Sequence, residues 1–120
     1  MASSVLVYSY ARCSTCRKAL AWLKEHNISH ELIDIIETPP SKKILREALE
    51  KLGSRKLLFN TSGLSYRALG SAAVKAMSDD EALDALAGDG KLIKRPFVIK
   101  GSGKVLVGFK PEVWADSFLT

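Results

Sequence analysis

Cysteine and histidine are scarce in this sequence, which has two of each among its 120 residues. The cysteines, Cys13 and Cys16, are three positions apart, so the chain lacks the disulfide framework of small secreted proteins. No apolar run approaches the roughly 20 residues of a membrane-spanning helix. The start of the chain also lacks the basic segment and small-residue cleavage site of a secretory signal. We therefore expect a cytoplasmic protein that does not bind membranes.

Charge of one sign is not concentrated anywhere in the chain. Eighteen Lys and Arg residues against 13 Asp and Glu residues give a formal net charge of +5, without a long basic block. Such a balance suits an anionic substrate or an acidic partner and does not indicate nucleic-acid binding. A chain of this length with 47% hydrophobic residues can bury a core, so we predict one domain over residues 1–120 and a monomer.

The two cysteines form a Cys-x-x-Cys motif between an apolar run and an amphipathic stretch. Two cysteines three apart in the first turn of a helix lie on one face, about 5–6 Å apart at Cβ, and can close a disulfide after a small adjustment. The helix start supplies free N–H groups and positive potential, which favour a thiolate on Cys13. Flanking Arg12 and Arg17 add positive charge. The pattern predicts a redox pair, with Cys13 the nucleophile and Cys16 the resolving thiol.

Two other interpretations of the motif exist. The chain also reads Cys-x2-Cys-x9-His-x3-His, which is similar to a zinc-finger pattern, with His26 and His30 as the histidines. If residues 16 to 26 are helical, however, His26 lies about 15 Å from Cys16, too far for zinc–ligand bonds of about 2.0–2.3 Å. We predict no metal site. Inert buried cysteines are the remaining alternative.

Hydrophobic periodicity places the motif within an α/β fold. Residues 5–9 and 30–36 are typical of strands, and the amphipathic stretch between them is typical of a helix, which together predict a parallel crossover. Residues 97–100 and 104–107, separated by a glycine-containing loop, predict an antiparallel hairpin. Pro111 opens a predicted C-terminal helix that covers the sheet.

The middle of the chain is predicted to be helical. Pro39-Pro40-Ser41 ends the second strand and starts a helix that Gly53 ends. Residues 64–69 can form a turn or two of helix, and Ser78 with Glu81 is a capping box. The order βαβ, helices, ββα predicts one mixed four-stranded sheet with a helical insertion over about residues 41–90.

Three blocks of sequence resemble the arsenate reductase/Spx family, which has a thioredoxin-like fold. They are the Cys-Ser-Thr-Cys helix at 13–23, Lys-Arg-Pro-Phe-Val-Ile-Lys at 94–100, and Val-Leu-Val-Gly-Phe-Lys at 105–110. Asn60-Thr61-Ser62-Gly63 with Tyr66-Arg67 is similar to the Spx/YffB-like branch. The resemblance implies that the bond between Arg95 and Pro96 is cis and that Arg95 faces Cys13.

Departures from the family pattern limit what the resemblance implies. The glutaredoxin-coupled arsenate reductases have serine where this chain has Cys16, and they grip the oxyanion with three arginines. Only Arg95 is retained, because the other two positions fall near Phe59 and near Val107 or Gly108. Since the arginine fork grips a tetrahedral oxyanion, we expect weak arsenate binding.

The resemblance therefore supports two functions and a set of site residues. The first is a cytosolic thiol-disulfide oxidoreductase that acts on a thiol, a disulfide or a small oxyanion and is regenerated by glutathione, glutaredoxin or thioredoxin, with no other cofactor. The backbone of Thr15 and Cys16, with Arg12, Arg17, Arg95 and Pro96, would bind substrate or stabilise the thiolate. The second is a redox-sensing regulator of the Spx type that contacts the RNA polymerase α subunit. A genuine arsenate reductase is a further alternative.

Overall fold

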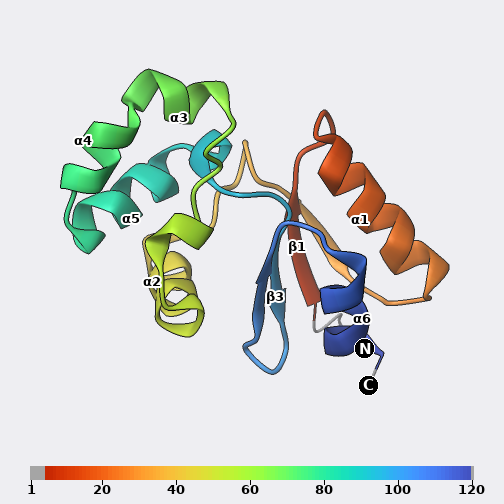
Figure 1. The fold of residues 1–120 in the computed structure, drawn as a ribbon. Helices are drawn as coiled ribbons and strands as arrows, with labels where there is room; N and C mark the ends of the chain where they lie inside the picture. Colours follow the sequence, from red (N-terminus) through yellow and green to blue (C-terminus); the bar gives the residue numbers. More distant parts are fainter. Residues whose placement is uncertain (1–4, 120) are drawn as a thin grey trace. The chain divides into compact units, whose positions relative to one another are not determined.

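The computed structural model describes residues 5–119, which divide into two compact units. The sheet unit contains the described residues up to Asp34 and those from Arg95 onward, and the helical unit is Ile35–Lys94. The ribbon in Figure 1 follows the sequence through both units. The single-domain assignment and the limits of the insertion stay predictions.

The sheet unit is built on four strands, β1 (Val5–Ser9), β2 (Glu31–Asp34), β3 (Phe97–Lys100) and β4 (Val105–Val107). Their order is β2-β1-β3-β4; β1 pairs in parallel with β2, and β3 pairs antiparallel with both β1 and β4. This is the mixed sheet of the thioredoxin-like fold, so the predicted fold class is confirmed. The parallel β1–β2 pair requires a crossover, which helix α1 (Ser14–Glu25) provides.

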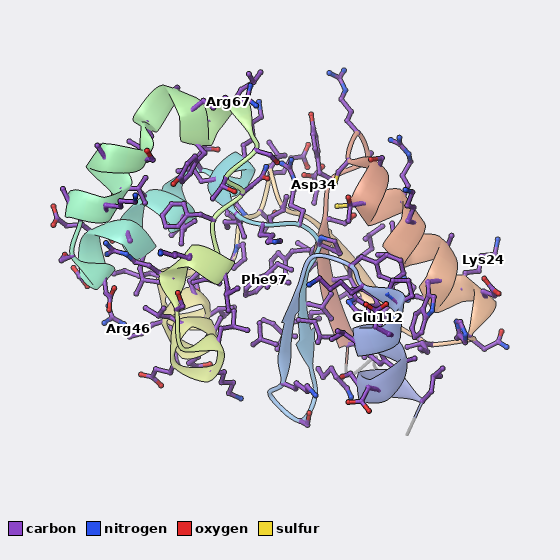
Figure 2. All side chains as sticks on the ribbon, viewed as in Figure 1. Lys24, Asp34, Arg46, Arg67, Phe97 and Glu112 are labelled. Carbon is purple, nitrogen blue, oxygen red and sulfur yellow. The ribbon has the colours of Figure 1, made fainter. Side chains whose placement is uncertain are left out.

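One face of the sheet carries the core of this unit. Alternate residues of a strand point to the same face, so Val5 and Val7 of β1 lie together there. Helix α1 and helix α6 (Pro111–Phe118) both pack against that face. The cluster contains Val5, Val7, Ala19, Leu23, Val98, Leu106 and Trp114. This packing fixes the start of α1 at the end of β1, where the cysteine motif lies. Lys24 points away from α1 into open space (Figure 2), as the amphipathic pattern requires.

The helical unit contains six short elements, and the caps that the sequence predicts for two of them are present. Ser41 caps the first of them by accepting from the N–H of Ile44, and Gly53 ends the same helix with a left-handed φ of 81°. Ser78 and Glu81 form the predicted capping box. The elements are α2 (Lys42–Leu52), the 3-10 turn η1 (Arg55–Leu57), α3 (Leu64–Leu69), α4 (Ser71–Ala76), α5 (Asp79–Gly88) and the 3-10 turn η2 (Gly90–Leu92).

Strand β2 is shorter than the predicted segment 30–36, because the chain turns at Ile35. The carbonyl oxygen of Ile35 lies against Gly90, where a Cβ would come within 1.9 Å of it. Only glycine allows that approach, so this contact fixes the first residues of the helical unit beside η2. Across residues 5–119, no helix is both long and apolar enough to cross a membrane.

Candidate active site

Cys13 lies at the junction of β1 and α1 and is the N-cap of the helix. Its backbone is extended (φ −88°, ψ 116°), and its Sγ accepts a hydrogen bond from the N–H of Cys16 at 3.3 Å. The sequence placed Cys13 within the first helical turn; it lies one position earlier, where a side-chain acceptor satisfies a free N–H group. The first turn of α1 contains no acidic residue, so its positive end is available to an anionic sulfur.

Cys13 is partly buried, and its pKa is lowered from the ordinary thiol value. Burial alone would raise the pKa, but hydrogen bonds to the sulfur from the thiol and backbone N–H of Cys16 outweigh it, together with the charge of Arg95 and the N–H of Thr15. Each of these groups stabilises the anion. Cys13 therefore has the properties of a nucleophilic thiolate.

Cys16 is fully buried and differs from Cys13 in its protonation. Burial raises its pKa to about 11, and its thiol hydrogen bond to Cys13 and the Cys13 charge raise it as well. The N–H of Tyr10 and the hydroxyl of Ser9 act in the opposite direction by donating to its sulfur. The Cys16 thiol thus keeps its proton and donates a hydrogen bond to the sulfur of Cys13.

Arg95 is the cation that lowers the pKa of Cys13. Its guanidinium carbon lies 5.2 Å from the ring centroid of Tyr10, a cation–π arrangement that orients the group. Its Nε is buried and has no hydrogen-bond partner among residues 5–119. A buried donor without a partner is costly, so a group that accepted a hydrogen bond from this atom would stabilise the site.

The bond between Arg95 and Pro96 is cis, as predicted. Pro96 is buried, and its carbonyl accepts a hydrogen bond from the N–H of Gly108 at 3.0 Å. This hydrogen bond joins the residue before β3 to the residue after β4. Arg95 precedes Pro96, and its charge acts on Cys13, which agrees with the predicted proximity of the two residues.

The other two predicted arginines, Arg12 and Arg17, are exposed. Arg17 is exposed, and its Nη1 donates to the carbonyl of Ala11 at 2.8 Å, which closes the turn before the helix. Arg12 is exposed on the same turn. Neither is among the causes of the pKa shift of Cys13. Their roles, and those of the other proposed site residues, stay predictions.

Ser9 and Tyr10 are contacts of the site that the sequence did not single out. Ser9 is the last residue of β1, and its side chain is 5% exposed. A polar residue that ends an apolar strand one turn before a cysteine motif is the signal that could have found it. Tyr10 accepts from the N–H of Cys13 at 3.0 Å through its carbonyl and supports Arg95 through its ring.

The histidines of the zinc-like pattern are engaged with backbone groups. Nδ1 of His26 hydrogen-bonds the carbonyl of Trp22, and Nδ1 of His30 that of Ile28, both at 2.9 Å. In the part of the chain that the structure describes, no three His, Cys, Asp or Glu residues are grouped to hold a metal ion.

Comparisons with known proteins match nearly the whole chain. The uncharacterized protein YusI of Bacillus subtilis is 46% identical over 96% of this chain and 98% of its own length. An arsenate reductase of Neisseria meningitidis is 31% identical over 87% of this chain and 89% of its own length. The regulatory protein MgsR of Bacillus subtilis is 27% identical over 92% of this chain and 87% of its own length.

Solved structures and a family model agree with these relatives. A structure from Streptococcus mutans, described as a possible arsenate reductase, superposes with a TM-score of 0.89 at 41% identity and covers 97% of this chain and 99% of its own. The ArsC family model matches residues 8–117. The chain therefore belongs to the ArsC family.

Proposed function

We propose that this protein is a thiol-disulfide oxidoreductase in which Cys13 is the nucleophile and Cys16 the resolving thiol. The observation that carries the proposal is the opposite pKa shift of two cysteines that share a hydrogen bond. Perturbed pKa values of opposite direction in one pair are typical of sites where one group attacks and the other follows. Membership of a family that contains arsenate reductases supports this class of chemistry.

In the first step the Cys13 thiolate attacks one sulfur of a substrate disulfide. A Cys13–substrate disulfide forms, the substrate S–S bond breaks, and the second substrate sulfur leaves as a thiolate. Arg95 and the N–H groups of Thr15 and Cys16 keep Cys13 ionised at neutral pH.

The second step needs Cys16 to lose its proton, and the first step favours that loss. When Cys13 is part of a mixed disulfide, it no longer accepts the Cys16 proton in a hydrogen bond to a thiolate, and its negative charge is gone. Two of the causes that raise the pKa of Cys16 therefore disappear. The Ser9 hydroxyl and the Tyr10 N–H remain to stabilise the Cys16 thiolate.

The Cys16 thiolate then attacks Cys13. A Cys13–Cys16 disulfide forms and the substrate leaves as a second thiolate, so the substrate disulfide gains two electrons and the enzyme dithiol loses them. Glutathione, glutaredoxin or thioredoxin would return the pair to the dithiol. No metal or organic cofactor takes part in this sequence.

A second candidate is a redox-sensing regulator, which the similarity to MgsR over most of both chains favours. In that case the same dithiol would switch a surface that contacts the RNA polymerase α subunit. Reduction of an oxyanion such as arsenate is a third candidate, for which Arg95 with its uncommitted Nε would supply the anion contact.

The experiment that separates the first two candidates is capture with a Cys16→Ser variant. Without the resolving thiol, the Cys13 mixed disulfide cannot be released, so substrate proteins should stay bound until a reductant is added. The Cys13→Ser, Cys16→Ser double variant is the control, since serine has nearly the size of cysteine but the variant has neither thiol.

Proteins eluted by reductant from the single variant and not from the double variant would support the oxidoreductase. Recovery of RNA polymerase subunits alone, equally from both variants and without reductant, would contradict it and favour the regulator.

A further inference from the structure

The helical unit contains a cavity that the cysteine chemistry does not use. Its volume is about 370 Å³, within the roughly 300–1,000 Å³ of small-molecule sites. Its lining comes from Ser54, η1, the loop after η1, α3 and α4. These segments all belong to the helical unit, and Figure 1 shows α3 and α4 following one another in green.

The interior of the cavity is apolar and aromatic. Phe59 is 2% exposed and Val74 6% exposed, and both line the cavity. The ring of Tyr66 meets that of Phe59 edge to face, with centroids 5.9 Å apart at 64°. Such a wall takes a flat apolar body, and the Tyr66 hydroxyl and the exposed Thr61 hydroxyl add polar contacts.

The charged residues of the lining are all cationic. Arg55 is already committed: it pairs with Asp79 at 3.3 Å and donates to the carbonyls of Val74 (3.1 Å) and Lys75 (3.2 Å). It thereby ties η1 to the end of α4 and forms part of the wall. Lys56 and Lys75 are exposed, and within residues 5–119 neither has an ion-pair partner, so their charges are available to a ligand.

We propose that this cavity binds a small amphipathic anion. The aromatic or compact apolar body of the ligand lies against Phe59, Tyr66 and Val74, and its single acidic group, a carboxylate, sulfonate or phosphate, lies between Lys56 and Lys75. The volume and the apolar wall account for the body, and charge complementarity accounts for the acidic group. This site is independent of the proposed chemistry at Cys13.

A pair of fluorescent probes tests both parts of the proposal. Anilinonaphthalenesulfonate carries the acidic group, and phenylnaphthylamine has the same aromatic body without it. Wild-type protein at neutral pH should bind both, the sulfonate more tightly, with shifts of the backbone amide signals of Phe59, Tyr66 and Val74 in NMR spectra.

Three variants separate charge from shape. Lys56→Gln with Lys75→Gln should weaken binding of the sulfonate about tenfold, which corresponds to about 1.4 kcal/mol for the loss of two exposed charges, and leave the uncharged probe unchanged. Thr61→Trp adds bulk at an exposed lining position and should abolish binding of both probes. Lys43→Gln, an exposed lysine of α2 outside the lining, is the charge control and should change neither.

Circular dichroism of each variant establishes that the helices are retained, and the uncharged probe checks that the cavity survives the lysine substitutions. The proposal is overturned if neither probe binds, if Thr61→Trp binds both as wild type does, or if Lys43→Gln weakens the sulfonate as much as the double lysine variant. Amide shifts confined to residues outside the cavity would overturn it too.

Discussion

At the scale of single residues, Cys13 and Cys16 have the same side chain and opposite environments. Cys13 begins a helix, is partly exposed and receives hydrogen bonds, whereas Cys16 lies a turn later with its side chain fully buried. The charge that distinguishes them comes from Arg95, which is distant in sequence, and not from the neighbouring arginines. The hydrogen bonds from Cys16 lower the pKa of Cys13 most, and the charge of Arg95 adds to their effect.

The first prediction concerns Arg95. Replacing Arg95 with Gln should raise the pKa of Cys13, because a charge that favours the thiolate is lost. Since the pKa rises, alkylation of Cys13 should slow most at neutral and mildly acidic pH and approach the wild-type rate at high pH, where the thiol is ionised in both proteins. The measurement is the pH dependence of iodoacetamide labelling at Cys13, followed by mass spectrometry.

Arg17→Gln and Arg12→Gln are the matched controls for this prediction. The guanidinium of Arg17 is held by the carbonyl of Ala11, and Arg12 is exposed, so both variants should shift the labelling profile less than Arg95→Gln. If Arg17→Gln shifts the labelling profile as much as Arg95→Gln does, the prediction is wrong and Arg17 stabilises the Cys13 thiolate as well.

At the scale of elements, helix starts and ends were the features most readily predicted from sequence. Ser41, Gly53 and the Ser78–Glu81 box act through backbone groups a few residues away, so local sequence determines them. The end of β2 was harder to predict from the sequence. The strand ends where Ile35 approaches Gly90, and this contact joins segments that are distant in the sequence. The cap of α1 was also displaced by one residue, since a sulfur acceptor serves there in place of an oxygen.

The second prediction concerns Cys13 as a helix cap. Cys13→Ser keeps a side-chain acceptor for the N–H of Cys16, whereas Cys13→Ala removes it. The serine variant should therefore be more stable than the alanine variant by about 1 kcal/mol in the free energy of unfolding. Urea denaturation measures the difference, and comparing the two variants removes the effect of thiolate charge.

Ser14→Ala is the control for this second prediction, because Ser14 is exposed at the first helical position and makes no capping bond. It should change the unfolding free energy by no more than about 0.5 kcal/mol. Equal stability of Cys13→Ser and Cys13→Ala would show that Cys13 contributes chemistry and no cap.

At the scale of the whole molecule, the sequence predicted the strands and a mixed sheet but did not indicate the order of the strands within it. Periodicity distinguishes strands from helices, but the placement of β3 beside β1 depends on pairing between the two ends of the chain. The same pairing holds Arg95 near the cysteine turn, which no local pattern could indicate. Ser9 and Tyr10 were missed for a related reason. Ser9 acts on Cys16 and the ring of Tyr10 on Arg95, and both contacts form only when the chain folds.

The last prediction concerns the arginines that the family resemblance led us to expect for holding an oxyanion. Of the three positions expected to carry arginine, one holds Arg95, one falls near Phe59, which is 2% exposed and packs on Tyr66, and one falls near Val107 and the buried Gly108. An apolar side chain or a glycine supplies no fork of donors for a tetrahedral anion.

Arsenate reduction with glutathione and glutaredoxin should therefore be weak or absent, while reduction of a small disulfide such as hydroxyethyl disulfide proceeds through the same Cys13. Both reactions should be lost in Cys13→Ser, which establishes that each depends on the thiolate. Arg95→Gln should slow both, since Arg95 stabilises the thiolate itself. Arsenate turnover by the wild type that equals a three-arginine relative would refute this reasoning, because a single arginine with its uncommitted Nε would then suffice to hold the anion.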